Sequence, residues 1–264
     1  MIKLTEDKLQ DVLDYMKEDL ENCLYLYGDI LLYGIDDPNM TVWYSQKDGN
    51  INLVLMQYFE GGHIYSREDD FQVEELVEKL REINPKRMSS KESIIRMIRP
   101  YMEDSYDVKF GGIFRLKNYR ELKSPVEIEK AQLKDVEAIA DLMIAHEPYK
   151  YTYTKKDMED ELRDRIEKGI GRSYIIRDGD RVVAHDAVTL ETPTYAVEGL
   201  ALVHDDFKKT LYGAFVDSYM INDLGREGKK LYCMIVEGRR YDAFVRLGNQ
   251  VCARYGKILR KDTV

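Results

Sequence analysis

Apolar residues in the second half of the chain recur at two spacings, and these predict helices and strands in a definite order. A spacing of three and four predicts an amphipathic helix over 133–145, and Thr154 is a suitable N-cap for a second helix. Strands are predicted at 173–177 and 182–189, because Asp178-Gly179 between them is a dipeptide typical of tight hairpins. Two helices therefore precede a hairpin of strands.

The next segment is the most informative, because a strand over 195–203 passes through a basic turn into a helix that ends near 224. A helix that starts after such a turn directs backbone N–H groups and the positive end of its dipole at whatever lies in front of it. Lys208 and Lys209 add formal charge there, and Gly213 leaves room for close backbone approach. This pattern predicts a site for a diphosphate.

A strand over 231–236 and a short helix follow, and the resulting order of elements resembles the GNAT superfamily of acyl-CoA-dependent N-acyltransferases. The family's pyrophosphate loop is usually written Gln/Arg-x-x-Gly-x-Gly/Ala, and the matching run here is 208–213. Gly213 fits this pattern. Lys208 replaces the first residue of the motif, and Leu211 stands where the family prefers Gly.

The end of the chain extends the resemblance. Residues 241–249 are similar to the family's closing helix and its ending Tyr-x-x-Leu-Gly-Phe. Phe244 occupies the place where many members have a Tyr, and Asn249 replaces the usual Phe. The resemblance covers 125–264 and implies an α/β (α+β) fold, with a GNAT-like mixed central sheet flanked by helices.

The first half carries a full set of elements of its own, separated from the second by a candidate linker at 117–125. Its Gly61-Gly62 pair is followed by acidic residues, so the half lacks a basic glycine-bearing turn between strand and helix. We interpret 1–120 as a degenerate GNAT-like domain and 125–264 as the GNAT N-acetyltransferase domain, with an unrelated α/β N-terminal half as the alternative. Helices or strands are predicted over 6–20, 41–44, 51–59, 73–83, 91–101 and 108–115.

The net charge of −9 opposes nucleic acid as the main partner, since a phosphate backbone needs a basic face. Residues 1–124 contain 17 Lys and Arg against 24 Asp and Glu, so they hold most of the excess negative charge. In residues 125–264 the positive and negative charges nearly balance. Basic residues there gather in the turns around the proposed diphosphate loop. Solvated turn residues are the alternative interpretation. These basic residues are Lys208, Lys209, Lys229, Lys230, Arg239 and Arg240.

The sequence also bounds the compartment and the cofactors. No apolar run approaches the roughly 20 residues of a membrane span, and the charged start of the chain does not resemble a secretory signal. Three cysteines, far apart and odd in number, argue against a disulfide framework. Four histidines without a His-x-x-x-His spacing indicate no metal site. We expect a cytoplasmic protein without a metal, a membrane or a nucleic-acid partner.

The resemblance implies acetyl-CoA as the donor substrate, with its pantetheine arm lying along 199–203 like an added strand. Backbone groups of Leu202 and Val203 would meet the arm, and a neighbouring N–H would polarise the thioester carbonyl. The diphosphate would meet the loop and the start of the helix. The expected cofactor-binding residues are Leu202, Val203, Lys208, Lys209, Thr210, Leu211, Tyr212, Gly213 and Ala214.

Acyl transfer to an amine needs a group that removes the amine's proton. Glu198 is the first candidate, because it lies on the same strand, ten residues before the first lysine of the loop, where several family members have a carboxylate. His204 and His185 are alternative bases, and Glu198 could instead be a solvent-facing strand residue. The family's usual acid for the leaving thiolate is a tyrosine. Since Phe244 holds that position, Tyr241, one helical turn earlier, is the proposed substitute.

Tyr149, Tyr151 and Tyr153 alternate between the first two predicted helices, a region that commonly lines the acceptor pocket in this superfamily. Three rings beside Glu147 could enclose a cationic amine by cation–π contacts. A short edge strand would give the same alternation. His185 is a further candidate for substrate binding.

These expectations describe an N-acyltransferase that moves an acetyl group from acetyl-CoA to a primary amine of a small molecule or peptide. The main alternative is a non-catalytic protein that binds acyl-CoA or another ligand, because Leu211 and Phe244 depart from the family pattern. A Fem-type aminoacyl transferase is also built from two GNAT-like halves, but its tRNA-linked donor favours a basic surface. A homodimer is left open.

Overall fold

The chain divides into two compact units, Met1–Phe114 with Ile235–Val264, and Arg115–Met234. The computed structural model describes residues 1–117, 121–147 and 149–261, without the side chains of Tyr151 and Thr152. The first boundary lies next to the expected linker at 117–125, of which Asn118 falls outside the described residues. The second boundary was not expected, because it assigns the last thirty residues to the first unit.

A mixed sheet forms the centre of the first unit. Its strands are β1 (Ile2–Lys3), β2 (Met40–Lys47), β3 (Asn50–Tyr58), β4 (Gly61–Tyr65), β5 (Arg87–Lys91), β6 (Tyr106–Leu116) and β12 (Gln250–Arg260). Their order in the sheet is β1-β2-β3-β4-β5-β12-β6. The pairs from β1 to β4 are antiparallel, β4 and β5 are parallel, and β5 and β12 are antiparallel.

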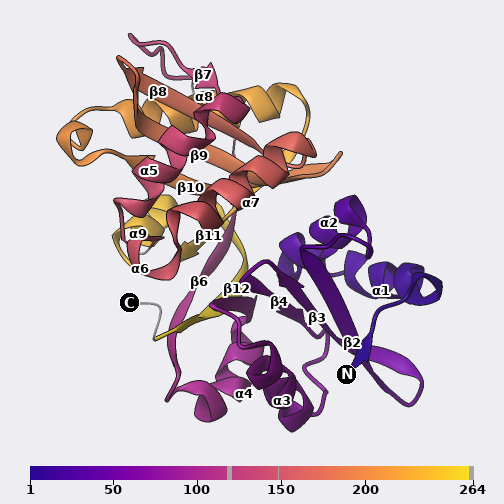
Figure 1. Cartoon of the computed structure of the whole chain (residues 1–264). Helices are drawn as coiled ribbons and strands as arrows, with labels where there is room; N and C mark the ends of the chain where they lie inside the picture. The colour runs from indigo at the N-terminus through magenta and orange to yellow at the C-terminus, as the bar shows by residue number, and fades with distance from the viewer. Residues whose placement is uncertain (118–120, 148, 262–264) are drawn as a thin grey trace. The chain divides into compact units, whose positions relative to one another are not determined.

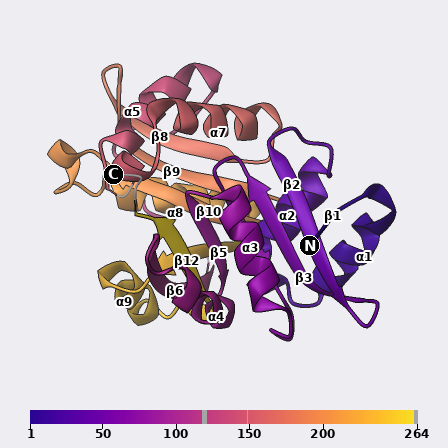
Figure 2. The same ribbon diagram turned by 60° about the horizontal axis from the view of Figure 1, so that its bottom comes forward.

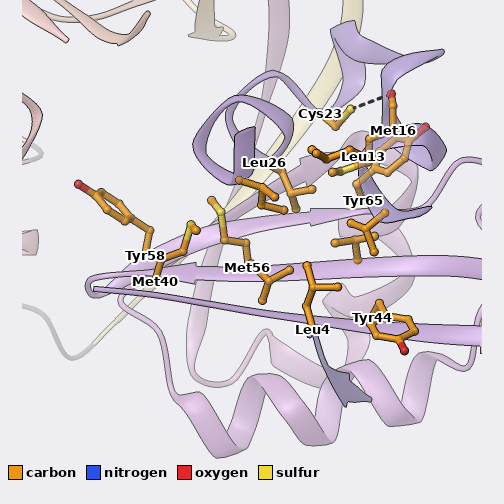
Figure 3. Close-up of a cluster of buried hydrophobic side chains, with 14 residues drawn as sticks. Leu4, Leu13, Met16, Cys23, Leu26, Met40, Tyr44, Met56, Tyr58 and Tyr65 are labelled. Carbon is orange, nitrogen blue, oxygen red and sulfur yellow. Dashed lines mark hydrogen bonds between the residues drawn. The ribbon is translucent and has the colours of Figure 1, made fainter. Parts of the chain in front are cut away.

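Helices cover both faces of this sheet (Figure 1). They are α1 (Glu6–Lys17), α2 (Leu24–Tyr33), α3 (Val73–Ile83), α4 (Glu92–Met102) and α9 (Arg239–Arg246), with the 3-10 turn η1 (Leu20–Asn22). Val54 and Met56 pack with α1 and α2, whereas Leu55 packs with α3 and α4. This division follows from the strand period, because successive side chains point to opposite faces. Figure 3 shows the cluster beneath α1 and α2, which includes Leu26 and Tyr65.

The second unit contains a smaller mixed sheet. Its strands are β7 (Glu129–Lys130), β8 (Arg172–Asp178), β9 (Arg181–Glu191), β10 (Tyr195–Val203) and β11 (Lys230–Val236), in the order β11-β10-β9-β8-β7. Its helices are α5 (Val136–Ile144), α6 (Tyr149–Thr152), α7 (Lys155–Glu167) and α8 (Tyr212–Arg226), with the 3-10 turns η2 (Leu133–Asp135) and η3 (Asp205–Phe207). The pairs from β7 to β10 are antiparallel, and β10 and β11 are parallel.

Helices also cover both faces of the second sheet. Ile175 of β8 packs in a core with α5 and α7, while its neighbour Tyr174 makes an edge-to-face contact with Tyr219 of α8, with ring centroids 5.7 Å apart. Because the two residues are adjacent on one strand, α8 lies on the face opposite α5 and α7. Figure 2 shows α5 and α7 side by side along this sheet.

The two units repeat one arrangement. In each, two longer helices (α1 and α2, or α5 and α7 with the short α6 between them) separate the first strand from a run of antiparallel strands, and the fourth strand leads through a helix to a parallel fifth strand. β4 therefore corresponds to β10, and α3 corresponds to α8. The sequence shows no such repeat, because hydrophobic patterning conserves the period of an element without conserving its residues.

Local patterns predicted many elements closely. The strand over 195–203 and the helix over 73–83 have the expected bounds, and Thr154 caps α7 with a capping box that includes Asp157. The sequence analysis missed α2, β4 and β5, which lack a clear amphipathic or alternating pattern. In the described ranges, no helix is both long enough and apolar enough to cross a membrane.

Candidate functional site

The site expected at the end of β10 begins where this strand loses its parallel partner. β10 pairs with β11 from Tyr195 to Glu198, opposite Lys230 to Cys233, and the recorded pairing stops there. β10 itself continues to Val203. The backbone of its last residues therefore lacks the β11 partner that its first residues have, which is the separation of central strands expected from the sequence.

A bulge shapes the same stretch of β10. Gly199 pairs with Ala187 and Leu202 pairs with His185, so β10 contains one residue more than β9 between these pairs. Leu200 occupies this position with a φ of 68°, a left-handed conformation that is uncommon for a leucine. Such strain persists only where the surrounding structure fixes it.

The side chain of His185 holds the bulge through a hydrogen bond to its backbone. Its Nδ1 lies 2.9 Å from the Leu200 carbonyl oxygen and its Nε2 lies 3.0 Å from Ser173 Oγ. The ring is 1% exposed, and burial lowers its pKa to about 4, so the imidazole is neutral at physiological pH. Nδ1–H then donates to the carbonyl, and Nε2 accepts from the serine. These contacts describe a residue that positions the strand, rather than the base or substrate ligand expected from the sequence.

The loop after β10 is ordered by its own side chains. His204 caps η3, because its Nδ1 accepts from the Asp206 N–H at 3.3 Å. Thr210 Oγ1 donates to the Phe207 carbonyl at 2.7 Å and accepts from the Tyr212 N–H at 3.2 Å. Phe207 and Tyr212 stack with ring centroids 5.6 Å apart. His204, Thr210 and Tyr212 thus hold the loop in shape by direct contacts within it.

The loop ends at the N-terminus of α8, as the strand-turn-helix pattern predicts. The N-cap residue Leu211 is 64% exposed and makes no side-chain hydrogen bond to the helix, whereas Thr210 Oγ1 accepts from the first N–H, that of Tyr212. The first-turn N–H groups of Gly213 and Ala214 have no intrahelical acceptor, as in any helix. A Cβ on Gly213 would lie 2.9 Å from Val203 Cγ2, so glycine is needed for the helix to approach the strand this closely.

The charges of this loop nearly cancel. Lys208 pairs with Asp205 at 2.7 Å, and Asp206 lies 3.5 Å from the Arg181 guanidinium. Lys209 is exposed and has no ion pair among the described residues. The positive charge expected from two lysines is therefore reduced to about that of Lys209 and the helix end, because two aspartates share the loop.

His146 reaches the end of β10 from the segment that follows the helix α5. Its Nε2 lies 3.0 Å from the Val203 carbonyl oxygen, and its Nδ1 lies 2.8 Å from the Leu142 carbonyl oxygen. Asp205 lies 3.4 Å from the same Nε2. A neutral imidazole has one N–H, so the tautomer decides whether the Leu142 or the Val203 carbonyl receives it. The sequence analysis did not include His146 in the site, since a histidine after a helix is commonly a cap.

Glu198 lies in a group of three carboxylates. Its side chain is 3% exposed, and carboxylate oxygens of Glu198, Asp186 and Asp217 lie within 4.8 Å of one another. Asp186 comes from β9 and is 1% exposed, while Asp217 comes from α8 and is partly buried. The alternative interpretation, in which Glu198 is a solvent-facing strand residue, is therefore wrong, and its role as the base stays a prediction. The group has the composition of a metal-binding cluster, so the expected absence of a metal stays a prediction.

Sequence reasoning missed the two aspartates of this group. Asp186 stands among apolar residues of β9 and Asp217 among apolar residues of α8. A charged residue inside an apolar run was the available signal, because such a residue is seldom buried without a specific reason.

Two of the three tyrosines expected at the acceptor pocket pack against one hydrophobic core. Their segment forms the short helix α6 rather than a loop or an edge strand. Tyr153 is 8% exposed and belongs to the core beneath α5 and α7, and Tyr149 packs against the same core. The side chain of Tyr151 lies outside the described residues. Tyr153 is therefore a core residue, and the role of these tyrosines in substrate binding stays a prediction.

Tyr241 and Phe244 both lie on α9, in the first unit. Arg254 Nη1 donates to Tyr241 Oη at 3.0 Å, and the Tyr241 ring packs against Phe114 with centroids 5.0 Å apart. Phe244 packs against the same phenylalanine. These contacts hold Tyr241 within its own unit, and its role as an acid stays a prediction.

Comparisons with known proteins agree with this arrangement of elements. No protein-family model and no curated protein matches the sequence. Among solved structures, a Drosophila protein is 12% identical, with coverage of 99% of this chain and 98% of that one and a TM-score of 0.69. A GCN5-related N-acetyltransferase-like protein from Streptococcus suis is 8% identical, with coverage of 97% and 99% and a TM-score of 0.62.

A third structure bears on the internal repeat. A tandem GNAT protein from the clavulanic acid biosynthesis pathway is 11% identical, with coverage of 97% of this chain and 96% of that one and a TM-score of 0.60. The match spans both units, and each unit has the same order of strands and helices. Sequence identities this low support a conclusion about the fold only. The chain therefore has the fold of the GNAT acetyltransferases, built twice in tandem.

Proposed function

We propose that this protein is an N-acyltransferase that transfers an acetyl group from acetyl-CoA directly to a primary amine of a small molecule or peptide. One observation carries the proposal: β10 loses its β11 partner after Glu198, and the chain then leads into the start of α8, where the N–H groups of Gly213 and Ala214 have no intrahelical acceptor. An unpaired strand can bind an extended amide chain, and a helix start can bind an anion. The pantetheine arm and the diphosphate of CoA are such a pair of groups.

The donor would lie along the end of β10. The arm's hydrogen bonds are assigned to 199–203, including the backbone groups of Leu202 and Val203, and His146 Nε2 lies 3.0 Å from the Val203 carbonyl oxygen. The N–H groups of Gly213 and Ala214 and the ammonium group of Lys209 would hold the diphosphate. The short distance between Gly213 and Val203 supports this assignment, because it lets the helix start meet the end of the strand without an intervening side chain.

The base would be Glu198. A thioester is already activated, so the protein has to position the amine, accept its proton and stabilise the developing oxyanion. Glu198 is 3% exposed, which favours transfer through an ordered water molecule rather than direct contact. Asp186 and Asp217 add negative charge beside it, and this charge favours binding of a cationic amine nearby. Neutral His185 is unsuited to attract a cation.

Binding and turnover test the proposal in two steps. Titration with CoA should raise the unfolding temperature in a concentration-dependent manner. Gly213→Val should weaken this effect, because the added side chain would meet Val203 where the diphosphate is expected. Asn222→Ala, later on the same helix, is the matched control and should leave the effect unchanged. Acetylation of a panel of primary amines then tests for catalysis, and the absence of any CoA effect would refute the proposal.

A non-catalytic acyl-CoA or ligand-binding protein is the second candidate. Three features favour it: Glu198 is almost fully buried, Lys208 is paired with Asp205, and Leu211 stands exposed where the family has a glycine. Such a protein would show the CoA-dependent stabilisation without turnover of any amine. The same two measurements therefore separate the candidates.

The proposed location is the cytoplasm. Among the described residues no disulfide joins Cys23, Cys233 and Cys252, which fits a reducing compartment. The proposed partners are the amine acceptor and, as an open option, a second copy of the chain.

A further inference from the structure

A lysine in the first unit stands between two other cations on one face of the sheet. Lys257 lies in β12, the strand between β5 and β6. Its neighbour Ile258 is fully buried in the core beneath α3 and α4, and a Cβ on Gly256 would lie 3.0 Å from Ile95 of α4. Because successive residues of a strand point to opposite faces, Lys257 projects from the face away from α4.

Arg87 and Lys109 come from the strands on either side. Lys257 pairs with Ser89, two residues along β5 from Arg87, so all three point to the same face. The residue after Lys109 is Phe110. Its ring lies on the α4 side of the sheet, 2.9 Å from where a Cβ on Gly256 would be. Lys109 therefore shares the opposite face with Lys257.

This setting changes the chemistry of the Lys257 amine. Burial, followed by the charges of Arg87 and Lys109, lowers the pKa of Lys257 from 10.5 to about 8. At pH 7.5 roughly a quarter of its amine is then neutral, against about one part in a thousand for an ordinary lysine. The side chain nevertheless remains partly exposed. Charged residues on the surrounding elements are Arg87 and Lys91 on β5, Asp107, Lys109 and Arg115 on β6, Glu21 on η1 and, on the opposite face, Glu92, Arg96 and Arg99 on α4.

We propose that Lys257 is an acyl-acceptor lysine, whose position between Arg87 and Lys109 makes its amine a nucleophile toward acyl thioesters in solution. The neutral Nζ attacks the thioester carbonyl carbon, the C–N bond forms, and the C–S bond breaks. The thiolate leaves with the electron pair of that bond, and the nitrogen releases a proton to water. The product is a neutral amide, so acylation also removes a charge that two neighbouring cations repel.

The proposal does not depend on the site at β10. A desolvated lysine beside a second cation is an established way to activate an amine. A simple thioester without a nucleotide, such as S-acetyl-N-acetylcysteamine, therefore suffices as donor. Failure of CoA to bind at α8 would leave this reaction unchanged.

The test measures acetylation of each lysine in the folded protein with S-acetyl-N-acetylcysteamine, by peptide mass spectrometry over time. Lys156 is the internal reference, because its side chain is 80% exposed and its partner Asp160 raises its pKa. At pH 7.5 we expect Lys257 to react at least about tenfold faster than Lys156, after allowance for the lower basicity of its amine. Equal or slower reaction at Lys257 would overturn the proposal.

The pH profile and one pair of variants separate the mechanism from simple exposure. The rate at Lys257 should level off above about pH 8, whereas the rate at Lys156 should keep rising about tenfold per pH unit. Lys109→Gln should lower the rate of acetylation at Lys257 several-fold at pH 7.5, because one repelling charge is gone. Asp107→Asn, on the same strand, should not lower this rate. A profile that rises to pH 10, or no effect of Lys109→Gln, would contradict the assigned role.

Discussion

At the scale of single residues, burial decides what each polar group can do. His185 and Glu198 looked alike in the sequence, as polar residues within strands of the same sheet. The structure buries both, but it gives His185 two hydrogen-bond partners and places Glu198 beside two other carboxylates. His185 is therefore a positioning residue, and Glu198 remains the candidate for chemistry.

Replacing Glu198 by Gln tests the base directly. The amide keeps the size of the side chain but cannot accept the proton, so we expect turnover to fall by about 100-fold or more. CoA-dependent stabilisation should stay the same, because the proposed cradle lies further along the chain. Asp186→Asn is the control: it changes the same carboxylate group without removing the base, and its effect should be smaller. Unchanged turnover in Glu198→Gln would disprove the assignment.

The neutral state of His185 predicts a dependence of stability on pH. Its folded pKa of about 4 lies below the usual 6.5, so between these values the unfolded chain binds a proton that the folded protein does not. The contribution of the neutral His185 ring to the free energy of unfolding is fully present above pH 6.5 and is lost as the pH falls toward 4. Urea unfolding should show wild type more stable than His185→Asn at pH 7, with the difference shrinking by about 2 kcal/mol at pH 5. A constant difference would contradict the buried neutral ring.

At the scale of elements, the start of α8 depends on the balance of charge in the preceding loop. A basic turn before a helix suggested a strongly cationic cradle, but Asp205 and Asp206 occupy the same turn. Asp205 Oδ1 lies 2.7 Å from Lys208 Nζ and 3.4 Å from His146 Nε2. In the proposed site, Asp205 would therefore compete with a diphosphate for Lys208.

Asp205→Asn should release Lys208. We expect CoA to bind several-fold more tightly, because a lysine becomes available and a negative charge is lost near the diphosphate. The gain should shrink as salt is added, since the exposed charges are then screened. Calorimetric titration at two salt concentrations measures both effects. Asp206→Asn removes the same charge without releasing Lys208, so an equal gain in that variant would show that the ion pair is irrelevant.

At the scale of the whole molecule, the last strand belongs to the first unit. β12 lies between β5 and β6, and it pairs with β5 from Tyr255 to Leu259. Ile258 is fully buried, and Arg254 binds Glu92 of α4 at 2.9 Å. The first half of the chain therefore completes its sheet with residues that come last in the sequence.

Removing β12 should damage the first unit most. In a chain that stops after Asn249, β5 and β6 lose the strand between them and the core loses Ile258 and Tyr255. We expect amide hydrogen exchange to rise sharply in β5 and α4, with much less change in β8 and β9. A chain that stops after Lys261 is the control and should resemble the wild type. Equal loss of protection in all of these elements would contradict this division.

The sequence by itself determined the elements and the local chemistry at their ends. Thr154 predicted its helix, Asp178-Gly179 its hairpin, and the run from 195 to 213 a strand, a turn and a helix start that the structure confirms. These features depend on residues close together in the chain, where periodicity and turn preferences act.

Only the tertiary structure decided which distant elements became neighbours. It brought Asp186 and Asp217 to Glu198, buried Tyr153, and placed β12 in the first unit. A strand's pattern fixes which of its faces is buried, but almost any strand with an apolar face can occupy a gap in a sheet. The neighbour of each strand in the sheet is therefore decided by packing across the whole chain. A local sequence pattern does not predict that neighbour.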